Sequence, residues 1–258
     1  MDALTTYKLF TANADNTLTR ISENPQNSRD VEYYLENIGS VKSAEELVED
    51  TRLLKFALSA YGLEEMSYAK ALFVKLLDEG TTETTALANQ LTDPRYKEFA
   101  EDFNFIEFGS ATTSFDKVQQ ELVDKFYQQE IEKQAGNDNV GARLAIYFER
   151  KVGEIESPLD VLADRALTQV FQTALGLPSQ MSLASIERQE EILSDRLDFE
   201  DLSDPEFVEN FVNRFLSLWD INNPSSTAVS PLITSATGSS QAVSFNLLTS
   251  IQNINSRG

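Results

Sequence analysis

The side chains that most often do chemistry in proteins are absent from this sequence. Its 258 residues include no histidine and no cysteine. The chain therefore has no thiol nucleophile, no disulfide, no thiolate metal site and no imidazole to serve as general base or metal ligand. Serine-histidine-aspartate and cysteine-histidine catalysis are excluded. What remains is carboxylate chemistry: an acid pair for sugar hydrolysis, or an oxygen-ligated Ca²⁺ or Mg²⁺ site.

The densest group of carboxylates lies in "LDFEDLSDPEF", which contains Asp198, Glu200, Asp201 and Asp204. This stretch lacks the turn glycine and the spaced ligands of a calcium loop, and two of its acids precede a predicted helix, whose dipole they would complement. We interpret them as helix caps. No acid is set among the aromatic residues and Gly-rich loops that would suggest a raised pKa. The sequence thus predicts no catalytic residue, no metal ligand, no cofactor and no enzymatic activity.

The charge of the chain limits the partners that it can attract. Asp and Glu total 42 against 21 Lys and Arg, a formal net charge of −21. Attraction to nucleic acid or to an anionic membrane is unfavourable at this charge. No apolar run approaches eighteen residues, and the N-terminus lacks the features of a secretory signal. We expect a soluble cytoplasmic protein with protein partners, no nucleic acid and no membrane insertion; its oligomeric state stays open.

The elements that position these side chains are expected to be helices throughout. Apolar residues recur at helical spacing, and no stretch alternates like a strand. One stripe runs along Leu159, Leu162, Ala163, Ala166, Val170 and Ala174, and another along Leu47, Leu54, Ala57, Leu58 and Tyr61. A further long helix is predicted to begin near Ser114. The predicted fold class is all-α.

Several helix ends are marked by capping residues. Ser43 with Glu46, and Ser157 with Asp160, have capping-box spacing. Proline in a first helical turn needs no N–H donor, so the Asp-Pro pairs at 93–94 and 204–205 also predict helix starts. Glycine suits the left-handed position after a helix, which we predict for Gly39, Gly62, Gly153 and Gly176.

Residues 29–63 align without a gap on residues 143–177, and nine of the 35 pairs are identical. About two identities are expected by chance. We therefore predict an internally duplicated domain, with two similar multi-helix halves at residues 1–112 and 113–221 packed about a pseudo-twofold axis. The identical pairs are Arg29/Arg143, Tyr33/Tyr147, Gly39/Gly153, Ser43/Ser157, Asp50/Asp164, Leu53/Leu167, Ala60/Ala174, Gly62/Gly176 and Leu63/Leu177.

Most of these repeated residues fit helix caps and a packed face, and only the Arg and Asp pairs are charged. The structural interpretation is that Arg29 pairs with Asp50, and Arg143 with Asp164, so that each pair holds two successive helices together. The functional interpretation places them in a binding site. The structural one is favoured, because ion pairs that fix packing are commoner than sites.

The composition changes after the second half. Residues 222–242 are rich in Ser, Thr, Pro and Gly and are predicted to form a flexible linker. Residues 243–258 form a short apolar segment, in which one helical face would dock either on its own domain or on a partner. The residues predicted for this docking are Val243, Phe245, Leu247, Leu248 and Ile251.

Four blocks of sequence, "YYLENIG", "AYGLEEM", "YFERK" and "ALGLP", resemble the alphaproteobacterial family called domain of unknown function 1217. The resemblance extends over nearly the whole chain, to about Trp219. Members often lie among flagellar genes, so the resemblance implies a role in motility or flagellar assembly. It brings no catalytic residue with it.

The hypothesis that follows is a non-enzymatic helical scaffold or interaction protein associated with the flagellum, in the cytoplasm or exported through that organelle. The first alternative is an acidic cytoplasmic export chaperone that holds a client helix in an apolar groove. The second is a carboxylate-dependent hydrolase acting on cell-wall glycan.

Overall fold

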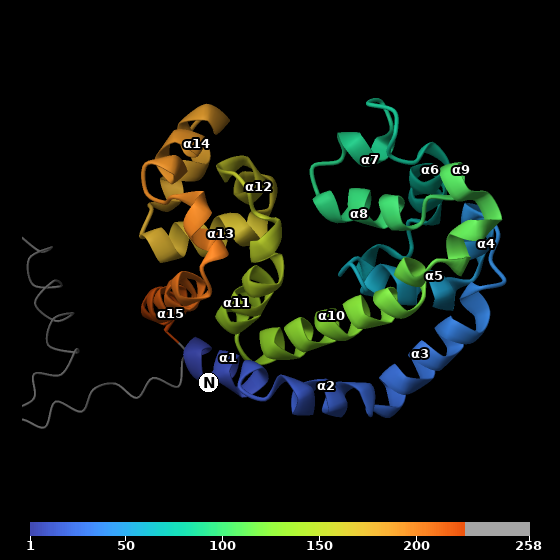
Figure 1. Cartoon of the computed structure of the whole chain (residues 1–258), viewed down its shortest axis with the longest axis horizontal. Coiled ribbons are helices and arrows are strands. Elements are labelled where there is room, and N and C mark those ends of the chain that lie inside the picture. Colours follow the sequence, from blue (N-terminus) through green and yellow to red (C-terminus); the bar gives the residue numbers. More distant parts are fainter. Residues whose placement is uncertain (225–258) are drawn as a thin grey trace, which may run out of the picture. The chain divides into compact units, whose positions relative to one another are not determined.

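The computed structural model describes residues 1–224, and every regular element in that range is a helix (Figure 1). The all-α prediction is therefore confirmed for this part of the chain. The helices before residue 110 are α1 (Ala3–Thr11), α2 (Ala14–Ser22), α3 (Pro25–Ile38), α4 (Ala44–Glu49), α5 (Thr51–Ser59), α6 (Lys70–Glu79), α7 (Leu87–Gln90), α8 (Pro94–Asp102) and α9 (Phe105–Phe108).

The helices that follow are longer on average. They are α10 (Gln120–Asp138), α11 (Val140–Lys151), α12 (Pro158–Ala163), α13 (Arg165–Leu175), α14 (Ile186–Ser194) and α15 (Pro205–Asn222). Short 3-10 turns connect several of them. Two such turns, Gly109–Ser114 and Asp116–Val118, occupy the stretch where the sequence predicted a long helix to begin. That prediction was early by six residues, since α10 starts only at Gln120.

The predicted caps are in place. The Ser43 hydroxyl accepts a hydrogen bond from the Glu46 N–H at 3.3 Å, and the Ser157 N–H donates to the Asp160 carboxylate at 2.8 Å. Asp93 and Asp204 cap α8 and α15, each with proline in the first turn. Asp198 likewise caps a 3-10 turn, so two members of the acidic cluster serve as caps, as predicted.

Two of the four predicted left-handed glycines are confirmed. Gly62 and Gly176 have φ of 66° and 65°, and the N–H of the following leucine reaches back to the last turn of the helix in both. The corresponding donors are Leu63, bonded to the Leu58 carbonyl at 2.9 Å, and Leu177, bonded to the Gln172 carbonyl at 2.8 Å. Gly39 has φ −63°, and Gly153 lies in a 3-10 turn, so the prediction is wrong for that pair.

Both apolar stripes are interrupted at an aspartate. Asp50 and Asp164 adopt extended backbone conformations, at ψ 97° and 118°, and each side chain accepts hydrogen bonds from the first N–H groups of the next helix. The stripe around Leu47 to Tyr61 is thereby divided between α4 and α5, and the later stripe between α12 and α13. An aspartate that satisfies orphan N–H donors makes such a break favourable within an apolar pattern.

The described residues contain two large hydrophobic cores and a smaller third one. The first core is built from α3 to α8 with the beginning of α10, and Tyr34, Phe73, Phe99 and Phe103 are fully buried in it. The second is built from α11 to α15, around Phe148, Phe171 and Phe215. Each core has its own aromatic cluster, so each group of helices has a hydrophobic centre of its own.

Helices α1 and α10 connect the two groups. Ala3, on α1, is buried in the second core, whereas Leu122 and Phe126, at the beginning of α10, are buried in the first. The third core joins α1 and α2 to the later part of α10 and to α11, through Phe10, Ile21, Ile131, Ala135 and Ile146. Figure 1 shows α10 extending from the α3–α9 group to the α11–α15 group, with α1 beside it. Helix α1 thus packs on the later group of helices, and the beginning of α10 packs on the earlier group.

The division predicted at residues 112/113 falls inside the turn Gly109–Ser114. Because the first core also draws on residues of α10, it extends beyond that division. Helix α15 ends at Asn222, where the linker was predicted to begin. No helix within residues 1–224 is long and apolar enough to cross a membrane.

Candidate functional site

The repeated Arg and Asp residues do not form the predicted ion pairs. Asp50 accepts a hydrogen bond from the Tyr33 hydroxyl at 2.7 Å, and Asp164 accepts one from the Tyr147 hydroxyl. The Arg29 guanidinium donates instead to the Gln26 side chain at 3.1 Å. The two ion-pair predictions were therefore wrong. In each aspartate, one carboxylate oxygen accepts hydrogen bonds from the first N–H groups of the next helix, and the other oxygen accepts one from the tyrosine hydroxyl.

This tyrosine contact shifts the pKa values of the two phenols and of Asp50. The hydrogen bond from Tyr33 to Asp50 raises the pKa of the phenol, and burial together with the same contact to Asp164 raises the pKa of Tyr147 well above its usual value. For Asp50, burial acts to raise the carboxyl pKa, but the hydrogen bonds from Leu53, Tyr33 and Arg52 outweigh it and lower the pKa. The pairs act as structural links between successive helices.

Asp164 and Arg143 nevertheless line one charged cleft in the described part of the chain. This cleft has a volume of about 440 Å³ and lies between α8 and the end of α5 on one side and α11 and α13 on the other, with α10 along its floor. Arg29 and Asp50, the other members of the repeat pairs, are not among its lining residues. The aligned positions of the two sequence segments therefore have different surroundings.

Most of the charged side chains that line the cleft are basic. Its walls carry six Lys or Arg side chains and four Asp or Glu side chains, in a chain that has twice as many acids as bases. The basic residues are Arg95, Lys125, Arg143, Arg150, Lys151 and Arg165, and the acids are Asp93, Glu98, Glu132 and Asp164. Basic side chains therefore outnumber acidic ones in the cleft, which is the reverse of the balance in the whole chain.

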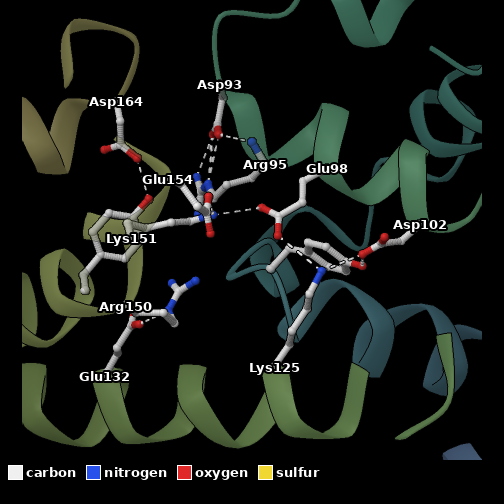
Figure 2. A network of polar contacts seen from close by, with 12 residues as sticks. Asp93, Arg95, Glu98, Asp102, Lys125, Glu132, Arg150, Lys151, Glu154 and Asp164 are labelled. Atoms are coloured by element: carbon white, nitrogen blue, oxygen red, sulfur yellow. Dashed lines mark hydrogen bonds and ion pairs between the residues drawn. The ribbon is translucent and has the colours of Figure 1, made fainter. Parts of the chain in front are cut away.

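Ion pairs hold most of these side chains in place (Figure 2). Lys125 on α10 lies 2.6 Å from the Asp102 carboxylate and 3.2 Å from that of Glu98. Glu98 on α8 also reaches Lys151, at the end of α11, at 3.6 Å, so this contact crosses the cleft. Although burial opposes it, the contacts with Asp102 and Glu98 raise the pKa of Lys125, which keeps the ammonium charged.

Arg95 lies beside this network at the opening of α8. Its guanidinium contacts the Asp93 carboxylate at 2.7 Å and donates to the Gly62 carbonyl at 2.7 Å. The positive φ of Gly62 turns that carbonyl toward α8, and an added Cβ at Gly62 would lie 3.3 Å from the Arg95 guanidinium. The repeated C-terminal glycine of α5 therefore also helps to build the wall of the cleft.

The most buried charge in the cleft is Glu132, on α10. Glu132 is 4% exposed, and its carboxylate accepts a hydrogen bond from the Arg150 guanidinium at 2.7 Å. Burial raises the pKa of Glu132, although the nearby cations Arg150, Arg143 and Lys151 lower it in part. A buried carboxyl with a raised pKa is a common feature of functional sites, and also of structural ion pairs.

Two cations in the cleft differ from the rest. Among the described residues, the guanidinium groups of Arg143 and Arg165 make no ion pair, while every other basic side chain of the cleft makes at least one. Both residues are exposed to solvent. Arg143 belongs to α11, and its side chain packs beside Gly136 of α10. Two unpaired guanidinium groups in a positively charged cleft are suited to bind anions.

Through the repeat, sequence reasoning found two of the charged cleft residues, Arg143 and Asp164. It missed the other basic ones, because they come from separate helices and no common spacing links them: Arg95, Lys125, Arg150, Lys151 and Arg165. The "YFERK" block does contain two of them. The predicted docking residues Val243, Phe245, Leu247, Leu248 and Ile251 lie outside the described part of the chain.

Comparisons with known proteins agree with this fold. The family model described as "Protein of unknown function (DUF1217)" matches residues 60–208, which include all the charged residues of the cleft. The chain belongs to this family. The match is shorter than the sequence resemblance suggested, since the "YYLENIG" block precedes it.

One solved member of the DUF1217 family has a closely similar structure. The crystal structure of protein AGR_C_984 from Agrobacterium tumefaciens matches with a TM-score of 0.78 and 41% sequence identity. The match covers 86% of this chain and 94% of that chain. No curated protein matches the chain.

Proposed function

We propose that this chain is a non-enzymatic interaction protein and that the cleft is its binding site. The observation that carries the proposal is the concentration of six basic side chains in one cleft of a chain with net charge −21. Structural ion pairs alone do not require this concentration, because Arg143 and Arg165 make no ion pair among the described residues. Clefts that combine a few fixed polar groups are the usual sites of recognition.

The carboxylates of the cleft favour binding over catalysis. Asp93, Glu98 and Glu132 are each bonded to a cation, and Asp164 accepts from Tyr147 while it caps α13. A general acid or nucleophile needs a carboxyl that is free to reach the substrate. In this cleft each carboxyl is already used to position a neighbouring side chain.

Glu132 is the residue that a carboxylate-dependent hydrolase would use, because burial raises its pKa as required of a general acid. Its contact with Arg150 argues against that role. Incubation with purified peptidoglycan at mildly acidic pH tests the alternative. Release of glycan fragments by the wild-type chain, and not by Glu132→Gln, would replace the binding proposal with an enzymatic one.

The flagellar part of the proposal is supported by the family resemblance. We propose that the chain acts as an assembly or motility factor, in the cytoplasm or associated with or exported through the flagellum, with a cytoplasmic export chaperone as the alternative role. Fractionation of motile cells separates these two. A flagellar component is expected in purified basal bodies or filaments, whereas a chaperone is expected in the soluble fraction alone.

The proposal also includes an ancestral duplication. Helices α4 and α12 begin at the same 114-residue offset that separates Arg29 from Arg143, as do α5 and α13. The Tyr-Asp contacts occur at that offset too. Helix α1 packs on the α11–α15 group, and the beginning of α10 packs on the α3–α9 group. Superposition of residues 29–63 on 143–177 in an experimental structure tests this origin. Failure to superpose would contradict it.

Residues 243–258 are proposed as a second contact with the partner. This part of the proposal is based on the apolar face predicted from Val243, Leu247 and Ile251. Deleting the segment is expected to abolish capture of the partner while the melting temperature stays nearly unchanged. A large fall in melting temperature would show instead that the segment docks on its own domain.

A further inference from the structure

We infer that the cleft binds an acidic peptide segment of a partner protein, whose carboxylates are taken by Arg143 and Arg165. This inference rests on the proposed function and names the chemistry of the ligand. The two guanidinium groups stand on different helices, Arg143 on α11 and Arg165 at the start of α13, and both line the same cavity. They therefore offer two separate positions for anionic groups within one cleft.

Charge excludes most other ligands. The formal charge of the cleft is positive, with six basic and four acidic side chains, whereas the whole chain carries −21. A cationic ligand would be attracted by most of the surface and would have no preference for this cleft. An anionic ligand is repelled elsewhere and attracted here, so the charge distribution provides specificity.

The arginine side chains favour carboxylate ligands. A guanidinium group donates two parallel hydrogen bonds to one carboxylate, which an ammonium group cannot do. The other cations are already bonded to Asp93, Glu98, Asp102 or Glu132. Their role is to hold the walls in place, which leaves Arg143 and Arg165 for the ligand.

The size of the site favours a peptide over a small anion. A second cavity of about 440 Å³ shares Arg95, Gln129, Glu132 and Arg143 with the cleft. Each cavity by itself has the volume of a site for a drug-sized ligand, and the shared residues place the two cavities beside each other at Arg143. Gln129 and Gln169 also line the cleft, and their amides are able to bond the backbone of an extended segment.

The ligand is not supplied by the end of this chain. Residues 226–258 contain no Asp and no Glu, so they have no acidic side chain to place beside either arginine. A second copy of the chain, with its 42 acids, is a different source of carboxylates. The experiment below therefore includes an arm that detects self-association.

The test measures binding of a short fluorescein-labelled peptide of alternating Glu and Ser to the full chain, by fluorescence anisotropy. Physiological ionic strength is used, because it limits repulsion by the rest of the protein to about 8 Å. The variant Arg143→Glu/Arg165→Glu is compared with Arg29→Glu, which changes the repeat-equivalent arginine outside the cleft. A peptide with Gln in place of Glu is the matched ligand control.

The expected result is saturable binding of the Glu peptide, weakened about tenfold or more by the double reversal and unchanged by Arg29→Glu. The milder variant Arg143→Gln/Arg165→Gln is expected to lose binding as well, which separates loss of charge from misfolding. Melting curves of all variants by circular dichroism confirm that they are folded.

Each of the following results would overturn the inference. Equal affinity of the wild type and both double variants would show that the arginines do not bind the ligand. Equal binding of the Gln peptide would show that carboxylates are not recognised, and displacement of the Glu peptide by inorganic phosphate at micromolar concentration would indicate a small-anion site. Loss of self-association on Arg143→Glu/Arg165→Glu, seen by light scattering, would identify a second copy as the ligand. If the peptide fails to bind but the wild-type chain still captures a cellular partner, the interaction role of the proposed function stands and this inference alone is wrong.

Discussion

Replacement of Arg150 by methionine tests how the cleft is held together. Arg150 donates to Glu132 at 2.7 Å, and Glu132 is 4% exposed. The substitution keeps most of the side-chain volume but leaves a buried carboxylate without its guanidinium. Removing one partner of a buried ion pair costs about 3 to 5 kcal/mol. Because the Arg150 side chain is 27% exposed, we expect a loss near the lower end, about 3 kcal/mol.

The double variant Arg150→Met/Glu132→Leu separates an unpaired charge from lost packing. Replacing both partners of a buried pair by apolar side chains is often neutral or stabilising, so the double variant should recover most of the stability lost by Arg150→Met. The difference between the single and double variants gives the coupling energy. Urea unfolding followed by circular dichroism measures each free energy of unfolding.

The pH dependence supplies an independent check. Burial raises the native pKa of Glu132 above its value in the unfolded chain. The native state therefore binds this proton more tightly, and stability from Glu132 declines as pH rises through its native pKa. Losing Arg150 raises that pKa further, so the deficit of Arg150→Met should be larger at pH 8 than at pH 5. A deficit below about 1 kcal/mol, or one that does not change with pH, would refute this reasoning.

Three further substitutions test other parts of the fold. Gly141→Ala would place a Cβ 2.3 Å from the Trp219 ring, so we expect a loss of about 1 to 3 kcal/mol in urea unfolding; Gly153→Ala, at a glycine with open space around it, should cost less. Asp50→Ala removes a helix cap and the contact with Tyr33, at a cost of about 1 to 2 kcal/mol, and since the pKa of Asp50 is lowered, this difference is expected to vanish as pH falls through it in acid titration. Tyr34→Phe leaves a fully buried backbone carbonyl without its 2.7 Å donor and should cost about 1 to 3 kcal/mol, measured as a fall in melting temperature.

Local features of the fold could be predicted from the sequence because their causes are local. The caps at Ser43, Ser157, Asp93 and Asp204 depend on one side chain and the next three residues. The division of the apolar stripe at Asp50 was missed, because apolar spacing continues across it. The packing of α1 on the second core and of the beginning of α10 on the first was also missed, since it depends on contacts between residues far apart in the chain. The Ala3 N–H donates to Asp220, 217 positions away, and Phe126 packs on the ring of Phe56.

The site was predictable only in fragments. The repeat identified Arg143 and Asp164, but opposite charge suggested that they pair, whereas the structure shows Asp164 bonded to Tyr147. The signal for the correct partner was present, because Tyr33 and Tyr147 are repeated at the same spacing as the aspartates. The cleft itself draws on α5, α8, α10, α11 and α13, and no sequence pattern brings those helices together.

The most direct test of the cleft as the binding site is photo-crosslinking in motile cells. A photoreactive amino acid is placed at Gln169, which lines the cleft, and in a second strain at Lys55, an exposed residue outside it. The account predicts a crosslink from Gln169 to a peptide rich in Asp and Glu from another protein, and none from Lys55. Crosslinks of equal yield at both positions, or from Gln169 only to peptides without acidic residues, would contradict it.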